Sequence, residues 1–540
     1  MSLPNSPYDA FRASLAARPE HPMLIAPASA GLAYAPDGFR ITYQQIGAEV
    51  EALIQALTDA GYGNGSRVAL ILENRPAFFS HWLALNGIGA SIVPINAEMR
   101  PEELAHQMKI AQPDLLITLP EHLPLAEAGC PPDLPRATVG GPLPQARLAK
   151  APAHDREPAT ECALLFTSGS TGKPKGCVLS NGDFLNVATW YTQMAAKAAP
   201  MPDQVISLTP LPFFHMNALG CNGVGMMLIG GAIVPLDRFS ASRWWQVVAD
   251  SEATIVHNLG VIPAILLQLP TSEAETRHKA RFNFSPGVDA QHKIDFEARF
   301  NLPIVEGWAM TETGGTGTID TAGIDYPSGQ RCIGIMRDDA EYRLVDDLGQ
   351  DVAIGQSGEL LIRAKGDNPR AGFFSGYLGD ETATEAAWEG GYFHTGDIMR
   401  VDEAGLFYFV DRKKSIIRRS GENISALEVE AVLKSNPAIQ ATAVTPITDA
   451  IRGEEVFAFI VLHQGADPDA EAIMAKASAQ LSYHKLPGHI AFVEALPLSS
   501  TQKLLRGQLR TEAEQLIAKG QVIDLTDKKG AFRKSVKASA

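Results

Sequence analysis

A glycine- and hydroxyl-rich segment between two apolar runs is the first stretch of the sequence that could do chemistry. It reads LLFTSGSTGKPKGCVLSN, residues 164–181. Glycines let backbone N–H groups converge, and serine, threonine and lysine add donors, so the composition favours binding of an anion such as phosphate. A Walker A loop requires GxxxxGK[ST], but Thr167 replaces its first glycine and Pro174 follows Lys173. The segment therefore predicts phosphate binding outside the ordinary P-loop class, or else a surface turn, which is the commoner fate of such clusters.

Three further segments follow in order along the chain. They are GWAMTETGG (307–315), the stretch from GYFHTGD to SALEVE (391–430) and PLSSTQKLLRGQLR (497–510). Together with TSGSTGKPKG (167–176), they resemble the motifs of the adenylate-forming superfamily of acyl-CoA synthetases, luciferases and peptide-synthetase adenylation domains. Trp308 and Ala309 replace the more usual Tyr-Gly, and Gln502 stands where glycine is usual. Four motifs in the same order as in the family are specific for it, whereas one motif alone would not be. The resemblance spans about residues 40–510.

The resemblance implies an ATP-dependent carboxylic acid:CoA ligase that forms AMP and pyrophosphate. A substrate carboxylate attacks the α-phosphorus of ATP, and the thiol of CoA then takes the acyl group from the acyl-adenylate. The implied cofactors are ATP, Mg²⁺ and coenzyme A, the last as a substrate. The phrases GVDA, EGWAMTETGG and RRSGENISALEVE are most similar to the carnitine- or crotonobetaine-type CoA ligases, a branch that leaves the acid itself open.

The same resemblance implies the nucleotide-binding residues. Glu312 is expected to hold magnesium, Thr311 to contact the α-phosphate, and Lys503 to bring positive charge to the adenylation transition state. Asp397 should accept hydrogen bonds from the ribose hydroxyls, and Trp308 should cover one face of adenine. The expected cofactor-binding set is Thr167, Ser168, Gly169, Ser170, Thr171, Gly172, Lys173, Lys175, Pro286, Gly287, Val288, Glu306, Gly307, Trp308, Asp397, Arg412 and, beside the pantetheine arm of CoA, Gly421.

The acyl pocket is expected near PLPFFHMNALG (210–220) and HNLGVIPAILLQL (257–269). His215 matches an aromatic or histidine gate beside the reacting carboxylate and is counted as catalytic. Without the motif, a buried histidine bonded to a backbone carbonyl would be an equally good interpretation. The other expected pocket residues are Phe214, Met216, Asn217, His257, Asn258 and Val261.

The second half-reaction implies a moving domain. The resemblance places a hinge at Lys414, between a large domain of residues 1–411 that binds ATP and the acid and a small mobile domain of residues 412–540. Rotation would withdraw Lys503 and bring RRSGEN (418–423) to the pantetheine route. Arg418 and Arg419 could then meet the phosphates of CoA, although a charged pair at a domain edge is at least as often only solvated.

The elements that must position these residues follow from periodicity. Residues 42–61 have helical spacing, with Thr42 as the cap and Gly61 as the stop, and short apolar runs such as 67–72 indicate buried strands. Helix and strand alternate up to about residue 320, whereas 333–410 has the shorter strands of an antiparallel region. The predicted fold class is α/β: a large domain of mixed, largely parallel sheets with packed helices and a small β region, then a small α+β domain.

Composition narrows the class of partner. With 46 basic and 61 acidic side chains the net charge is −15, which disfavours nucleic acid and anionic membranes and favours small-molecule substrates. No signal peptide is evident, the apolar stretch 218–236 reads as a buried helix-turn-strand, and five scattered cysteines suit a reducing compartment. We therefore expect a cytoplasmic monomer or homodimer without integral membrane contact, and a frayed basic tail after residue 525.

Two alternatives stay open at this point. A stand-alone adenylating enzyme that loads a carrier protein would have the same motifs, and the acceptor thiol would distinguish it. A non-catalytic nucleotide-binding homologue is the second alternative. The presence of Lys175, Glu312, Asp397, Arg412 and Lys503 argues against a loss of chemistry.

Overall fold

The structure is a computed structural model that describes residues 4–153, 156–167, 174–288, 290–327, 330–346, 348–412, 416–420, 422–497 and 506–530. Its first sheet is parallel except for the edge strand β2. In the described ranges it has seven strands, in the order β13 (Ile304–Val305), β12 (Phe282–Phe284), β11 (Ile255–His257), β9 (Ile206–Thr209), β10 (Ala232–Pro235), β1 (Pro22–Pro27) and β2 (Gly38–Thr42).

A second sheet is parallel from β7 to β6 and antiparallel at its other edge. Its order is β19 (Gly376–Tyr377), β8 (Lys175–Ser180), β7 (Glu161–Thr167), β4 (Ser91–Pro94), β3 (Arg67–Ile71), β5 (Leu115–Thr118) and β6 (Arg136–Thr138). The antiparallel pair β7–β8 brackets the glycine-rich loop, so this sheet edge positions the predicted phosphate site.

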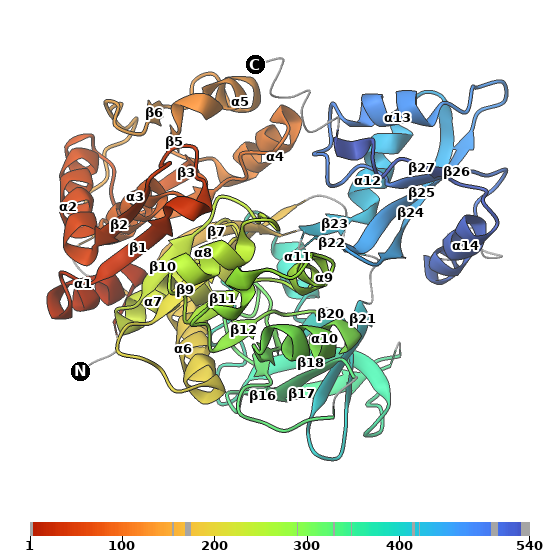
Figure 1. The fold of residues 1–540 in the computed structure, drawn as a ribbon. Helices are drawn as coiled ribbons and strands as arrows, with labels where there is room; N and C mark the ends of the chain where they lie inside the picture. The colour runs from red at the N-terminus through yellow and green to blue at the C-terminus, as the bar shows by residue number, and fades with distance from the viewer. Residues whose placement is uncertain are drawn as a thin grey trace.

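Helices connect and cover these two sheets (Figure 1). They are α1 (Pro7–Ala17), α2 (Tyr43–Asp59), α3 (Pro76–Gly87), α4 (Pro101–Ala111), α5 (Leu123–Gly129), α6 (Asn181–Ala198), α7 (Gly225–Ile229), α8 (Trp244–Asp250), α9 (Val261–Leu267) and α10 (Ala290–Phe300). The predicted cap is confirmed, because the Thr42 hydroxyl accepts the Gln45 N–H and the Gln45 side chain accepts the Thr42 N–H. The stretch 218–236 is also buried as expected, in the π-helix η3 (Asn217–Val224), α7 and β10.

The predicted antiparallel region is confirmed as a third seven-stranded sheet within the described part of the chain. Its order is β14 (Gly307–Trp308), β15 (Ile319–Asp320), β16 (Cys332–Met336), β21 (Phe407–Arg412), β20 (Phe393–Val401), β18 (Ser357–Ala364) and β17 (Ala340–Val345), with α11 (Glu381–Ala386) nearby in sequence. Asp397 on β20 is the register partner of Arg412 on β21, so the backbone brings two expected ribose residues together.

The C-terminal part forms its own sheet and apolar core, drawn in blue at the upper right of Figure 1. The sheet contains β23 (Glu422–Ser425), β22 (Ile416–Arg419), β25 (Gly453–Leu462), β26 (His489–Phe492) and β27 (Ile523–Asp524), with β24 (Ile439–Asp449) also paired to β25. The helices of its described residues are α12 (Ala426–Lys434), α13 (Ala470–Ala477) and α14 (Arg506–Ala518). The β24–β25 pair is an antiparallel hairpin, and β25–β26 is parallel.

The basic tail is not frayed at its start, which corrects the expectation for residues 526–530. Lys529 is 1% exposed, and its ammonium donates a 2.6 Å hydrogen bond to Glu455 Oε1. The other carboxylate oxygen of Glu455 accepts from Arg419 Nε at 2.7 Å. A buried carboxylate between two cations therefore ties this segment to β22 and β25. The tail composition suggested solvation, but charges are buried when they are paired in this way.

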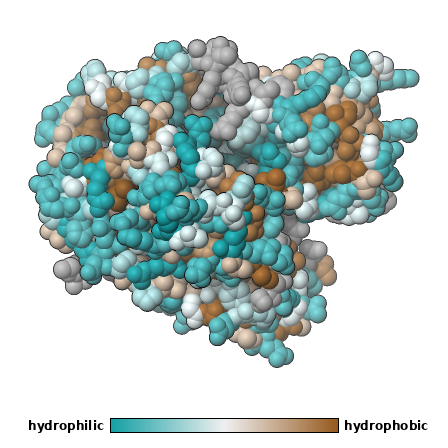
Figure 2. All heavy atoms as spheres, in the orientation of Figure 1, coloured by the Kyte–Doolittle hydropathy of each residue, from teal (hydrophilic) through white to brown (hydrophobic). Residues whose placement is uncertain are grey.

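The surface is largely polar, as the charge composition predicts. Figure 2 shows hydrophilic side chains over most of the visible face, with apolar side chains gathered mainly on the C-terminal part. None of the helices in the described ranges is long and apolar enough to cross a membrane.

Candidate functional site

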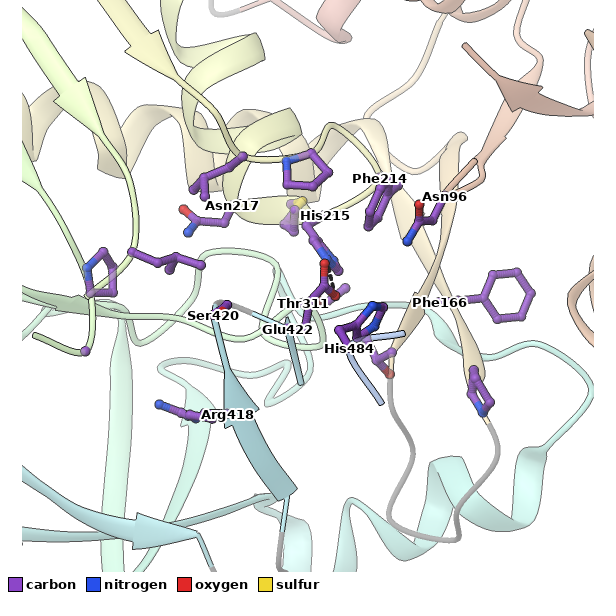
Figure 3. Close-up of a pocket in the computed structure, with 18 of the residues that line it drawn as sticks. Asn96, Phe166, Phe214, His215, Asn217, Thr311, Arg418, Ser420, Glu422 and His484 are labelled. Carbon is purple, nitrogen blue, oxygen red and sulfur yellow. Dashed lines mark ion pairs between the residues drawn. The ribbon is translucent and has the colours of Figure 1, made fainter. Parts of the chain in front are cut away.

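A deep cavity lies between the N-terminal sheets and the C-terminal sheet. Its lining includes Thr311, Glu312, His215 and Asn217 from the first part of the chain and Glu422 from the second. Figure 3 shows side chains from distant parts of the sequence facing one another across it. The structure thus brings together residues that the sequence places more than 200 positions apart.

Glu312 forms the centre of a polar cluster at the phosphate-loop end of the cavity. Its Oε1 accepts hydrogen bonds of 3.2 Å from the Thr167 hydroxyl and of 3.2 Å from the Tyr377 hydroxyl. The Lys175 ammonium lies 4.8 Å from the centre of the Tyr377 ring and 3.7 Å from the Asp380 carboxylate. Burial and the neighbouring Glu312 charge raise the pKa of Tyr377, so its hydroxyl stays a donor. Tyr377 was not foreseen, because only the β19–β8 pairing brings it here.

This cluster suits magnesium. Mg²⁺ takes oxygen ligands and is generally held by one or two carboxylates together with substrate phosphates. Glu312 supplies a carboxylate that is only 7% exposed, and the neighbouring hydroxyl and ammonium groups suit bound phosphate. No cluster of three or more His, Cys, Asp or Glu side chains that could hold a metal occurs among the described residues. Besides Glu312, phosphate oxygens and water would be the ligands of a bound Mg²⁺.

Trp308 and Asp397 are in direct contact. The Trp308 indole N–H donates a 2.8 Å hydrogen bond to Asp397 Oδ2, and both side chains are buried. The expected adenine platform and the expected ribose acceptor therefore form one unit. The sequence predicted a role for both residues but not their hydrogen bond. The more usual Tyr has no indole N–H that could donate it.

The segment 286–288, expected along adenine, is held in place by Glu306. The Glu306 carboxylate accepts the Gly287 N–H at 2.9 Å and the Val288 N–H at 3.2 Å. Burial raises the pKa of Glu306 to about 7 despite these donors and nearby cations. Gly287 has a φ of +82°, a conformation that favours glycine. Glu306 therefore shapes the backbone of this segment.

The expected acyl residues separate into two groups. Phe214, His215, Met216 and Asn217 line the cavity, whereas His257 and Asn258 are completely buried and do not. The His257 Nε2 atom lies 2.8 Å from Asn217 Oδ1, so His257 stands behind the wall. Lining residues that the sequence did not indicate are Trp190, Cys221, Leu259, Phe284 and Ala309. Leu259 and Ala309 lie within the quoted segments 257–269 and 307–315, whereas no motif marks Trp190 and Cys221.

Contacts between described residues join the two parts of the chain across the cavity. Glu422 Oε2 lies 3.9 Å from His215 Nε2, as the dashed line in Figure 3 marks. Burial alone would raise the pKa of Glu422, but His215, His484 and Lys485 lower it to about 2. Lys485 also bonds Glu103 at 2.7 Å and Glu428 at 2.8 Å, and Arg100 Nε donates to Leu481 O at 3.3 Å.

The two arginines of RRSGEN have different surroundings. Arg419 is 4% exposed and paired with Glu455, so the suggestion that it meets CoA phosphates is wrong in this structure. Arg418 lines the cavity, and its guanidinium lies 4.9 Å from the Phe409 ring. A strand alternates its side chains between two faces, which separates these neighbours.

Several predicted site residues lie outside the described residues. They are Ser168, Gly169, Ser170, Thr171, Gly172, Lys173, Lys414, Gly421 and Lys503, together with the side chains of Val261 and Arg412.

The chain has relatives among known families and proteins. It matches the sequence model of the AMP-binding enzyme family over residues 11–378 and that of the AMP-binding enzyme C-terminal domain over residues 428–503. It is 30% identical over 494 residues to the crotonobetaine/carnitine–CoA ligase of Salmonella paratyphi A, covering 87% of this chain and 93% of that protein. The enzyme of the same name from Escherichia coli O9:H4 is 29% identical over 493 residues, with coverage of 87% and 93%.

Solved structures have the same fold. The o-succinylbenzoate CoA synthetase of Bacillus subtilis superposes with a TM-score of 0.77 at 23% identity, covering 94% of this chain and 98% of that one. The amide bond synthetase McbA of Marinactinospora thermotolerans gives a TM-score of 0.75 at 23% identity, covering 93% and 99%. At these identities the likeness concerns the fold alone.

Proposed function

The chain belongs to the AMP-binding enzyme family and is an acid–thiol ligase of the acyl-CoA synthetase class, and from this premise we propose how its residues divide the reaction. The reaction joins a carboxylic acid to CoA at the expense of ATP, releasing AMP and pyrophosphate. The observation that carries the proposal is that Glu312, His215 and Trp308 line one cavity, with Asp397 buried behind Trp308 and hydrogen-bonded to it.

The adenylation half uses the first part of the chain. Magnesium, held by Glu312, would offset phosphate charge when it is bound. Lys175 and Thr167 hold the pyrophosphate that leaves, together with the loop residues 168–173, and Thr311 contacts the α-phosphate. Trp308 covers adenine, Asp397 and Arg412 bind the ribose or phosphate, and Lys503 stabilises the transition state. Glu306 keeps residues 286–288 along the base, which its hydrogen bonds to Gly287 and Val288 support.

The thioester half uses the second part. We place the domain boundary between residues 411 and 412 and the hinge at Lys414. The contact between His215 and Glu422 supports an orientation in which the β22–β23 turn lies beside the acyl site, as the CoA step requires. Arg418 and Gly421 would then border the pantetheine arm, and His215 would border the acyl group.

An acid panel tests the proposal. Short aliphatic, fatty, aromatic and betaine-type acids are incubated with ATP and magnesium, and pyrophosphate release is measured with and without CoA. The names of the relatives make crotonobetaine and carnitine the first acids to include. We expect at least one acid to release pyrophosphate and to yield its CoA thioester. Adenylation without transfer to CoA, but with transfer to a phosphopantetheine-bearing carrier protein, would favour the carrier-loading alternative, and an absence of pyrophosphate release with every acid would favour the non-catalytic one.

We also propose a cytoplasmic location and a monomer or homodimer. All five cysteines are buried and unpaired, which supports a reducing compartment. Cell fractionation and light scattering test these two statements.

A further inference from the structure

One hydrogen-bonding group beside His215 has no part in the proposed chemistry. It is the side-chain amide of Asn217, the first residue of the π-helix η3. π-Helical turns are rare and occur frequently at functional sites. Asn217 is partly exposed and lines the cavity, and Figure 3 shows it near His215.

His257 fixes the orientation of this amide. Its Nε2 lies 2.8 Å from Asn217 Oδ1, and burial lowers the pKa of His257 to about 3, so the ring is neutral with a single N–H. Nδ1 is buried and has no hydrogen-bond partner among the described residues. A proton on Nδ1 would therefore leave a buried donor unpaired, which is rarer than an unpaired acceptor. The proton belongs on Nε2, Asn217 Oδ1 accepts it, and the NH₂ group is left to donate elsewhere.

The groups around this pair are uncharged. The His257 ring stacks on Tyr191 at 5.1 Å and meets the edge of Phe284 at 4.9 Å. Trp190 packs against Phe284 at 5.9 Å and donates its N–H to Asp320 at 2.8 Å, and Asp320 does not line the cavity. Burial also raises the pKa of the Cys221 thiol, which keeps it protonated. The groups packed against His257 are thus uncharged and leave the Asn217 amide as a fixed donor, with the Glu422 carboxylate 3.9 Å from the neighbouring His215.

We propose that Asn217 is a specificity-determining residue that selects an uncharged acyl group with a hydrogen-bond acceptor and discriminates against a quaternary ammonium. This inference rests on the proposed function. A trimethylammonium group is recognised by exposed aromatic faces or a carboxylate. Here Trp190 and Phe284 meet edge to face and are 3% and 1% exposed, so they form no open cage, and the Glu422 carboxylate of the cavity already faces His215 at 3.9 Å. A substrate without an acceptor would leave the desolvated amide donor unpaired, a loss that reduces binding.

Matched acids test this inference. Each scaffold carries one of three ends: a ketone, a tert-butyl group or a trimethylammonium group. The aliphatic set is 5-oxohex-2-enoic acid, 5,5-dimethylhex-2-enoic acid and crotonobetaine, and the aromatic set is 4-acetyl-, 4-tert-butyl- and 4-trimethylammoniobenzoic acid. We expect the ketone acid to have the highest kcat/KM for pyrophosphate release in each active set, about tenfold above that of the tert-butyl acid. This ratio corresponds to the free energy of one hydrogen bond in a closed site.

Two variants sharpen the comparison. Asn217→Leu should lower the kcat/KM of the ketone acid to that of the tert-butyl acid. Asn217→Asp places a carboxylate at this position and should raise the kcat/KM of the trimethylammonium acid relative to those of the other two acids. A wild-type preference for the trimethylammonium acid, or a ketone to tert-butyl ratio near one, would overturn the inference and leave the ligase function standing. No pyrophosphate release with any acid, including the wider panel, would instead overturn the proposed function.

Discussion

The indole nitrogen of Trp308 lies 2.8 Å from Oδ2 of the fully buried Asp397 and donates a hydrogen bond to it. The two residues are 89 positions apart and come from β14 and β20. A buried carboxyl group is costly unless it is hydrogen-bonded, so this indole stabilises the buried Asp397 side chain. The proposed adenine platform therefore also orients the proposed ribose acceptor.

Trp308→Phe should weaken ATP use because it keeps an aromatic face but removes the donor to Asp397. A hydrogen bond to a charged group contributes about 1.5–3 kcal/mol, which corresponds to a fall of roughly tenfold or more in kcat/KM for ATP. ATP–pyrophosphate exchange measures it at saturating acid. Trp308→Tyr, which restores the residue more usual in the family, is the control and should lose less than Trp308→Phe. An equal decrease in kcat/KM for ATP in the two variants would mean that the indole hydrogen bond does not contribute to ATP use.

Much of the fold could be predicted because its signals are local. The Thr42 cap, the buried strand beginning at Arg67 and the antiparallel strands after residue 333 each follow from a few neighbouring residues. The candidate site was predictable only as separate motifs. Their mutual contacts depend on sheet pairing, so the hydrogen bonds of Trp308 to Asp397 and of Tyr377 to Glu312 were not foreseen.

The burial of charged groups was the part that local patterns predicted wrongly. Lys529 lies in a basic, polar stretch that is typical of a solvated tail, and Arg419 lies in a charged pair. Both are buried because Glu455, on a different strand, neutralises them. Composition cannot show a partner that is distant in sequence, and this is why the tail and the role of Arg419 had to be corrected.

Lys503→Ala should separate the two half-reactions. Loss of one preorganised cation at a transition state costs roughly a hundredfold to a thousandfold in rate, so acyl-adenylate formation should fall by that factor. Thioester formation from a supplied acyl-adenylate should stay close to wild type, because the proposed rotation removes Lys503 from the site. Single-turnover assays of each half measure both rates. A matching loss in both halves would contradict the assigned role.

Glu422→Gln should slow the CoA step. The substitution keeps the side-chain size but removes the charge that faces His215 at 3.9 Å. Because the pair is partly exposed, its contribution should be at most about 1 kcal/mol, or a two- to fivefold effect. Transfer from a supplied acyl-adenylate to CoA should fall by this factor, while ATP–pyrophosphate exchange should not. Glu403→Gln, on an exposed loop, serves as the matched control. Slower exchange with unchanged transfer would contradict the proposed orientation.

Stability should fall in mild acid because of His257. Burial lowers its pKa to about 3, whereas an unfolded histidine titrates near its ordinary value of 6.5. Between these values the unfolded chain takes up a proton that the folded chain does not. The free energy of unfolding therefore has its full value above pH 6.5 and decreases as the pH falls below it. From pH 6.5 to 5 this amounts to about 2 kcal/mol. Urea unfolding of wild type and His257→Phe at several pH values measures the difference, and parallel pH profiles would exclude the effect.

Lys529→Met should destabilise the C-terminal part far more than the neighbouring substitution Lys528→Met. Lys529 is buried against Glu455, and removing one partner of a buried ion pair costs about 3 kcal/mol or more, here reduced because Arg419 remains bonded. Lys528 pairs with Glu471 at the surface, where such pairs contribute about 1 kcal/mol or less. Thermal unfolding of the two variants measures the contrast. Arg419 precedes the turn that brings Glu422 to His215, so Lys529→Met should also slow transfer to CoA more than adenylation. Equal melting temperatures for the two variants would show that the buried cluster is not what holds the tail.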